Sequence, residues 1–245
     1  MRESPQILAG HLEELRRRLG VSLAALLLAV ALSFTQAERI IRWLARPVEP
    51  FVPQFVFFSP TEPLLAYLNV SMLAGITLAM PVLLAQLWGF VRSGLTARER
   101  SLGLVFVGWG SAQFLAGAAT AYYVLLPAAM RLLFRIGDRY LKPAISIDRY
   151  LSFVTTLVFW SGLVFELPVV LVLLAKLGIV TPEWLRQQRP YAMLILVILA
   201  AIITPTTDPV NLLLLAAPLL FLYELAIVLS RFVAPSRIRQ TPAPR

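Results

Sequence analysis

The chain has 245 residues, of which 59% are hydrophobic, and it carries a net charge of +9 with a mean hydropathy of +0.78. Several apolar runs of about 20 residues predict an all-α integral membrane protein with many spans. The absence of cysteine and the presence of one histidine, His11, exclude disulfides, thiolate chemistry and a His/Cys metal site. No P-loop sequence is present, so we expect no cofactor. The basic residues flank apolar spans, which indicates membrane orientation and not nucleic-acid binding.

The N-terminal segment is predicted to be an amphipathic helix. Residues 5–19 place leucines at helical spacing with charges on the other side, and the segment runs directly into a first apolar span at 20–34. Glu13 and Glu14 each precede an arginine by four residues, which favours two weak ion pairs. The three arginines at 16–18 precede the first span and therefore place the N-terminus in the cytoplasm.

The first outer loop is predicted to form a cap. The T-x-x-E sequence from Thr35 to Glu38 resembles a capping box and predicts an amphipathic helix at 36–45. Five prolines then favour a rigid, extended segment over residues 46–63. The candidate residues of this outer cap are Pro47, Ser59 and Pro60.

The second and third spans are joined by a basic inner loop. The second span covers about 61–91 and has Gln86 as its one strong polar group in the inner half. The loop at 92–101 returns to the cytoplasm, and the third span follows at about 102–134. Glu99 ends a T-x-x-E sequence, so it is a candidate either for a helix cap or for ligand binding. Capping uses only part of a carboxylate, which leaves both roles open.

A single carboxylate interrupts the fourth span, residues 150–178. This span is roughly 43 Å long as a helix, so Glu166 lies near the middle of a roughly 30 Å hydrocarbon layer. Acids at that depth usually face a bundle interior or wet cavity and mark a pathway or binding site. Pro168 predicts a kink beside the acid. The alternative is a protonated Glu166 hydrogen-bonded to a neighbouring helix for packing alone.

The C-terminal part is predicted to contain two short spans. A short cytoplasmic helix at 183–188 precedes span five, about 191–203, and span six, about 210–229. Short spans require local bilayer thinning or a partner subunit. We predict one membrane domain over 1–231 and a disordered basic cytoplasmic tail over 232–245.

The distribution of positive charge predicts six spans with both termini in the cytoplasm. Segments on the predicted inner side contain 14 Lys and Arg residues, and those on the outer side contain 8. Short loops rich in Lys and Arg remain in the cytoplasm.

Six sequence motifs occur in one order along the chain. Together they resemble the TatC family, the multispanning core of the twin-arginine protein translocase, over nearly the whole chain from His11 to about Arg231. The motifs are HLEELRRRL (11–19), FFSPTEPLLAYL (57–68), TARER (96–100), FELPV (165–169), TPTTDP (204–209) and LYE (222–224).

The resemblance implies a receptor in the bacterial cytoplasmic (inner) membrane. Such a protein recognises signal peptides with consecutive arginines on folded cargo. It also organises small single-span subunits of the TatA/TatB type, is driven by the protonmotive force, and is expected to self-associate. The candidate signal-peptide-binding residues are His11, Glu14, Arg16, Phe90, Arg98 and Glu99. The candidate intramembrane polar or partner-contacting residues are Gln86, Glu166, Pro168, Thr204 and Asp208.

Two positions depart from the family pattern. The family often has F-x-x-P-G-L after the second span, whereas this chain has Ser93 in place of the proline. The family also often has glutamine four residues after the last-loop aspartate, where this chain has Leu212. The second departure weakens a polar partner contact there and leaves Thr204 as the candidate.

The chemistry of the candidate residues fits an arginine ligand. Guanidinium groups prefer carboxylates in bidentate geometry, and two arginines need at least two such acceptors. Glu14 and Glu99 are both predicted at the cytoplasmic membrane edge, where each ion pair contributes about 1–3 kcal/mol.

Two other functions remain open from the residues alone. One is a proton- or ion-coupled carrier of small solutes that uses Glu166, and the other is a scaffold that only gathers other spans. No nucleophile, base and orienting group occur as a set, so we expect no enzyme.

Overall fold

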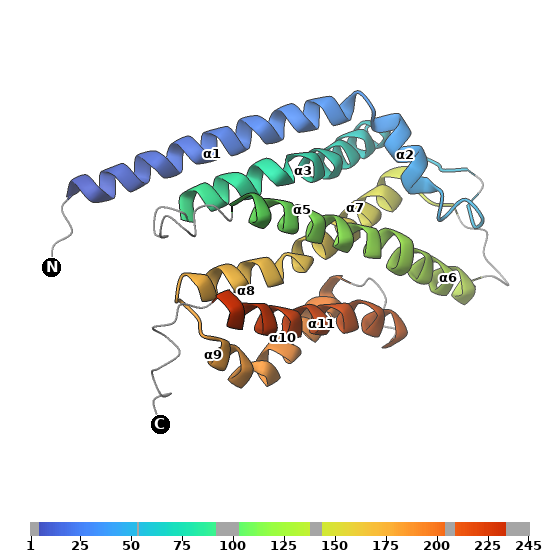
Figure 1. Cartoon of the computed structure of the whole chain (residues 1–245). Coiled ribbons are helices and arrows are strands. Elements are labelled where there is room, and N and C mark those ends of the chain that lie inside the picture. Colours follow the sequence, from blue (N-terminus) through green and yellow to red (C-terminus); the bar gives the residue numbers. More distant parts are fainter. Residues whose placement is uncertain (1–4, 53, 92–102, 138–143, 204–208, 234–245) are drawn as a thin grey trace.

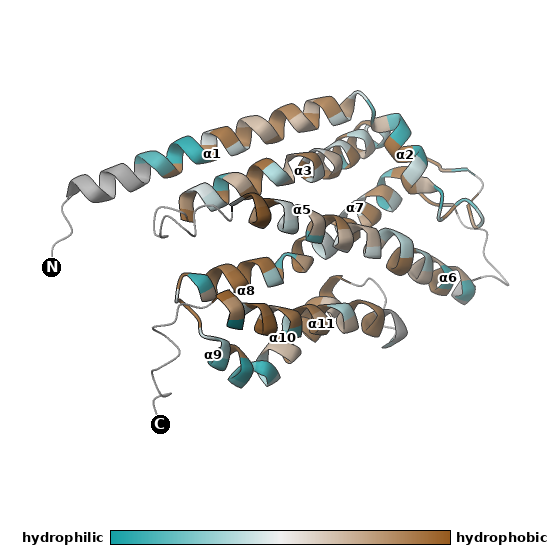
Figure 2. Cartoon of the chain, viewed as in Figure 1, coloured by the Kyte–Doolittle hydropathy of each residue, from teal (hydrophilic) through white to brown (hydrophobic). Residues whose placement is uncertain are grey.

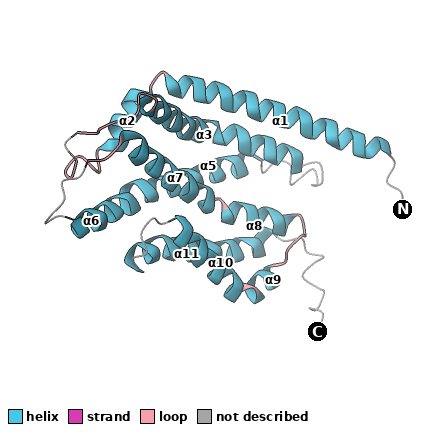
Figure 3. Cartoon of the chain, turned by 180° about the vertical axis from the view of Figure 1, so that it is seen from behind, coloured by secondary structure: helices cyan, strands magenta, loops and turns pink. Residues whose placement is uncertain are grey.

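The computed structural model describes residues 5–52, 54–91, 103–137, 144–203 and 209–233 (Figure 1). These residues form helices joined by turns and loops (Figure 3). The helices in chain order are α1 (Pro5–Phe34), α2 (Ala37–Ala45), α3 (Glu62–Val91), α5 (Gly103–Thr120), the π-helical turn η2 (Ala121–Leu125), α6 (Leu126–Gly137), α7 (Ile147–Phe165), α8 (Leu167–Lys176), α9 (Pro182–Gln187), α10 (Arg189–Ile203) and α11 (Pro209–Val233).

The predicted all-helical membrane class is confirmed. Within the described residues, a shorter apolar helix, Arg189–Ile203, accompanies five helical segments that are long and apolar enough to cross a membrane. Those five segments are Glu13–Phe34, Glu62–Val91, Gly103–Arg135, Ile147–Lys176 and Leu212–Val233. Hydrophobic residues cover the middle of the helices, and hydrophilic residues gather towards several helix ends (Figure 2).

Several helices share one end of the bundle, on the left of Figure 1, which we call the inner end because the predicted topology places it at the cytoplasm. There, α1 begins and α3, α8 and α11 end, whereas α2 and the start of α7 lie at the opposite, outer end. Helices α1 and α3 run side by side in both views, and α8, α10 and α11 form the other side of the bundle (Figures 1 and 3). The first amphipathic helix and the first span are one continuous helix, as predicted.

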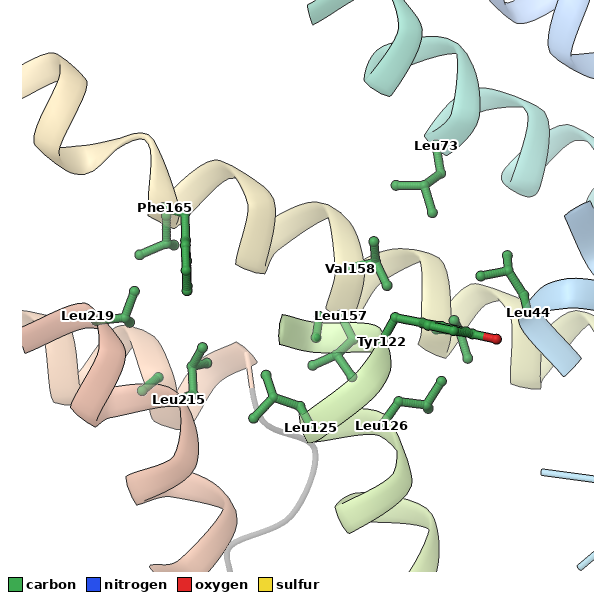
Figure 4. Packing of buried hydrophobic residues seen from close by; sticks show 14 of the residues in the cluster. Leu44, Leu73, Tyr122, Leu125, Leu126, Leu157, Val158, Phe165, Leu215 and Leu219 are labelled. Carbon is green, nitrogen blue, oxygen red and sulfur yellow. The ribbon is translucent and has the colours of Figure 1, made fainter. Parts of the chain in front are cut away.

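Buried side chains from α2, α3, η2, α7 and α11 form the main core (Figure 4). Two buried tyrosines fasten α2 to this core. The Tyr150 hydroxyl donates to the carbonyl of Leu44 at 2.8 Å, and the Tyr122 hydroxyl donates to the carbonyl of Trp43 at 2.5 Å. These bonds satisfy carbonyls near the C-terminal end of α2, and they position the outer cap over the bundle.

The outer cap differs from its prediction in two ways. The capping box at Thr35 is wrong, because the Thr35 hydroxyl donates to Leu32 and α2 begins after Gln36 without a side-chain cap. The following segment forms successive turns instead of an extended chain. Val48 and Val52 are buried in the core, so the turns of this proline-rich segment are fixed by two buried valines. Val56 then pairs through its backbone with residues 145 and 147 of the second outer loop.

The predicted kink beside the intramembrane acid is confirmed. α7 ends at Phe165, Glu166 has φ −72° and ψ −11°, and α8 begins at Leu167 with Pro168 in its first turn. Proline fits that position because its missing N–H would have no intrahelical partner there.

The two C-terminal spans differ in length. α10 has 15 residues, or about 22 Å of helix, so the short span five is confirmed. The short span six is wrong, because α11 has 25 residues and its Leu212–Val233 part is long enough to cross a membrane. Pro218 lies inside α11 without ending it, and the helix continues past the predicted end of the span at 229 to Val233.

Candidate functional site

The inner end of α1 carries an ion pair between Glu14 and Arg18. The Arg18 guanidinium donates to one Glu14 carboxylate oxygen from Nε at 3.0 Å and from Nη2 at 2.6 Å. The Glu14 side chain is 28% exposed and the Arg18 side chain is 14% exposed, so this pair is more shielded from water than an ordinary surface pair. The predicted Glu14–Arg18 pair is therefore confirmed, whereas no Glu13–Arg17 pair occurs among the described side chains.

Arg18 also joins α1 to α3. Its Nη1 atom donates to the Gln86 side-chain oxygen at 3.5 Å, a long contact between residues far apart in the chain. The guanidinium lies against Gly89, where a Cβ atom would overlap its Nη1. Gln86 thus belongs spatially with the N-terminal acid, although the sequence grouped it with the intramembrane polar residues. Arg18 and Gly89 were not predicted site residues.

The other predicted peptide-binding residues are only partly placed. Phe90, next to Gly89, is 38% exposed near the inner end of α3, and Arg16 is exposed on α1. His11 lies within α1, but its side chain is outside the described set. Arg98 and Glu99 lie outside the described residues, as do Thr204 and Asp208.

Glu166 is buried without a hydrogen-bond partner. Its side chain sits at the break between α7 and α8 with the residue 7% exposed, and neither carboxylate oxygen has a partner among the described residues. The packing-only alternative needs a hydrogen bond to a neighbouring helix, and the described part of the chain supplies none. A buried carboxyl with unmet hydrogen-bonding capacity is costly, which favours a functional reason for its presence.

Further buried polar atoms without a partner occur on α5 and α7. Ser111 and Gln113 on α5 and Ser161 on α7 each have a buried polar atom without a partner in the described structure. α5 comes close to the acid at Gly110, where a Cβ atom would lie 3.2 Å from Glu166 Oε2. Ser111, Gln113 and Ser161 were not predicted as site residues, because serine and glutamine in an apolar helix usually find local partners.

The remaining sites lie at the outer cap and the C-terminal helices. The Ser59 and Thr61 hydroxyls share a hydrogen bond of 2.9 Å, Pro60 is exposed and Pro47 is half-buried. Arg189 at the start of α10 pairs with Glu224 of α11 at 2.5 Å. No group of three or more potential metal ligands occurs in the described residues.

Comparison with known proteins places this arrangement in a family. Residues 10–218 match the family model described as Sec-independent protein translocase protein (TatC). The TatC protein of Carboxydothermus hydrogenoformans is 37% identical, over 96% of this chain and 97% of that protein. The TatC protein of Aquifex aeolicus is also 37% identical, over 91% of this chain and 94% of that protein.

Solved structures agree with the sequence comparison. A crystal structure described as the twin-arginine translocase receptor TatC is 36% identical, covers 91% of this chain and 99% of its own, and gives a TM-score of 0.77. A second, determined in DDM, gives a TM-score of 0.79 at 37% identity, over 90% of this chain and 99% of its own. The chain is therefore a multi-pass membrane protein of the bacterial TatC family, the Sec-independent protein translocase proteins, and acts in protein transport and not as an enzyme.

Proposed function

We propose that this protein is the receptor of a Sec-independent translocase and binds twin-arginine signal peptides of folded proteins. The binding surface is the inner end of the α1–α3 pair together with the loop that follows α3. The protein lies in the bacterial cytoplasmic membrane with six spans and both termini in the cytoplasm.

The observation that supports this proposal is the Glu14–Arg18–Gln86 connection. Arg18 holds the Glu14 carboxylate in place and also contacts Gln86 on α3. Gln86 lies four residues before Phe90. A fixed carboxylate at the inner membrane edge suits a guanidinium ligand, because little side-chain entropy is lost on binding. Glu99 would supply a second carboxylate for the second arginine, and Phe90 an apolar surface for the adjoining peptide segment.

The C-terminal half is the proposed docking region for single-span partner subunits of the TatA/TatB type. α10 is too short to cross about 30 Å of hydrocarbon, so a partner or a thinned bilayer must accommodate it. Its exposed face is apolar, with Leu194, Ile195, Ile198 and Ile202 each about half exposed or more. The buried polar atoms around Glu166 are a second candidate contact for a partner helix.

Transport by this assembly uses the protonmotive force, as in the family it belongs to. The chain has no P-loop sequence, so nucleotide hydrolysis by this subunit has no support. The match to the TatC family argues against the solute-carrier alternative. Glu166 is therefore better assigned to partner assembly or transport. Self-association of the receptor is part of the same proposal.

Photocrosslinking of a twin-arginine signal peptide to membrane-embedded protein tests the receptor site. Glu14→Gln and Glu99→Gln are expected to lower peptide crosslinking about tenfold, since each removes a charge-assisted bond of roughly 1.5 kcal/mol. Glu13→Gln is the matched control, because Glu13 is exposed and neighbours Glu14 on the same helix. Unchanged crosslinking in both test variants at normal protein levels would remove the site assignment.

A further inference from the structure

An apolar cavity of about 340 Å³ opens near the inner end of the bundle. Residues from α3, α5, α8 and α11 line it, including Trp88, Phe106, Leu173 and Leu229. Its volume lies at the small end of the range for ligand pockets, about 300–1,000 Å³. One of its walls carries a charged side chain, Lys176.

Lys176 is held at this wall by an aromatic ring. The residue is only 8% exposed, and its Nζ atom lies 5.9 Å from the centre of the Trp88 ring. A cation above an indole face is stabilised by the ring's electrons, more so when it is shielded from water. The Trp88 N–H itself is buried and has no hydrogen-bond acceptor in the described structure. Among the described lining residues, Lys176 is the one charged side chain, so it supplies ammonium donors to an otherwise apolar wall.

Such a combination of features fits an amphiphile with a negative head. Apolar walls accept a hydrocarbon chain, and a shielded ammonium favours an anionic oxygen. Basic pockets between membrane helices on the cytoplasmic side are suited to anionic phospholipid head groups. Lys176 is the last residue of α8, at the inner end of the bundle, where an apolar span meets the head-group layer in the predicted topology.

We propose that this cavity binds an anionic phospholipid of the inner leaflet, with the lipid phosphate beside Lys176 and part of an acyl chain between α5, α8 and α11. The lipid fills a gap that the chain leaves open between its N-terminal and C-terminal helices. Bound lipid therefore stabilises their packing, because a ligand that binds only the folded state raises its stability. The site uses Lys176 on α8, which is not among the proposed peptide-binding residues, but it shares the inner end of α3 with that surface through Trp88.

Native mass spectrometry of the purified full-length protein in detergent tests the proposal. Phosphatidylglycerol and phosphatidylcholine with identical acyl chains are titrated onto wild type and Lys176→Met, which removes the charge but keeps an unbranched side chain. We expect wild type to bind phosphatidylglycerol at least fivefold more tightly than phosphatidylcholine. Lys176→Met is expected to abolish this preference, and Lys176→Arg is expected to retain it. Arg186→Gln, an exposed change on α9, is the matched control and should leave the preference intact.

Two further measurements distinguish a bound lipid from a bound free phosphate and from a lysine that serves only the fold. Glycerol phosphate, a head group without chains, should not displace phosphatidylglycerol at millimolar concentration, and displacement would assign the site to free phosphate instead. Added phosphatidylglycerol should raise the melting temperature of wild type but not of Lys176→Met. A lower melting temperature in Lys176→Met with an unchanged lipid preference would show that Lys176 acts only in folding, and would overturn the proposal. Equal binding of both lipids by wild type would overturn it as well.

Discussion

The Arg18 guanidinium on α1 lies against Gly89 on α3, in space that any larger residue at position 89 would occupy. Through this contact Arg18 reaches Gln86 while it holds Glu14. A glycine without a catalytic or conformational role thus sets the position of a carboxylate on another helix. The relationship connects the packing of α1 on α3 with the geometry of the proposed receptor site.

Gly89→Ala is expected to displace Arg18 and to loosen the Glu14 carboxylate. A Cβ atom there overlaps Nη1, so either the guanidinium or α1 must move. We expect a severalfold loss of signal-peptide crosslinking with a smaller change in melting temperature, because the obstructed group is the end of a flexible side chain. Gly20→Ala on α1 is the control, since a Cβ atom at Gly20 meets nothing within 4 Å. Wild-type crosslinking by Gly89→Ala would mean that Arg18 does not position Glu14.

Glu166→Leu is expected to separate stability from transport. The buried carboxyl has no partner in the described structure, so an apolar side chain of similar size relieves an unmet polar group. We predict a free energy of unfolding equal to wild type or higher by about 1–3 kcal/mol. Export of a twin-arginine precursor should fall, while peptide capture stays near wild type. Thermal melting in detergent and export in membrane vesicles measure the two effects. A less stable variant with normal export would return Glu166 to a packing role.

Gly117→Ala is expected to weaken the packing of α5 against α7. An ideal Cβ atom would lie 2.6 Å from the Ser161 carbonyl oxygen and 2.7 Å from the Phe165 ring, and backbone cannot move aside as a side-chain end can. We expect a loss of about 1–3 kcal/mol of stability. Gly108→Ala, on the same helix with nothing within 4 Å, is expected to be neutral or stabilising by about 0.5–1 kcal/mol. The difference in melting temperature between the two variants measures the contact, and equal values would contradict it.

Tyr150→Phe is expected to loosen the outer cap. The change removes the hydroxyl that donates to Leu44 and leaves that carbonyl buried without this donor. The cost is about 1–3 kcal/mol, the desolvation penalty of an unpaired buried group. Tyr191→Phe is the control, because Tyr191 is 65% exposed. Hydrogen exchange in residues 37–48 should rise in Tyr150→Phe only, and an unchanged exchange pattern would mean that the cap is held elsewhere.

Local sequence patterns predicted much of the fold. The continuous first helix, the break at Glu166 and the short α10 follow from periodicity, from Pro168 and from the length of an apolar run. The α2 cap was mispredicted because the T-x-x-E sequence competes with a bond from Thr35 to the preceding turn of α1. The predicted sixth span ended at about 229, before the polar Ser230 and Arg231, whereas α11 continues to Val233.

Features that depend on contacts between distant helices could not be predicted. The spacing of Glu14 and Arg18 indicated their pair, but nothing local signals that Gln86 completes it or that Gly89 leaves the necessary space. The absence of a hydrogen-bond partner for the Glu166 carboxylate in the described structure likewise depends on how the helices pack. The cavity beside Lys176 is formed by four helices and has no sequence signature.

The proximity of positions 14 and 99 in the native membrane tests the central claim most directly. The chain contains no cysteine, so Glu14→Cys combined with Glu99→Cys introduces the only thiols. Oxidation should form an internal disulfide between them, and a twin-arginine signal peptide present before oxidation should slow its formation. Glu38→Cys with Glu99→Cys, which places one thiol on α2 at the outer end, should not crosslink. No disulfide between positions 14 and 99 in correctly inserted protein would contradict the paired-carboxylate receptor site.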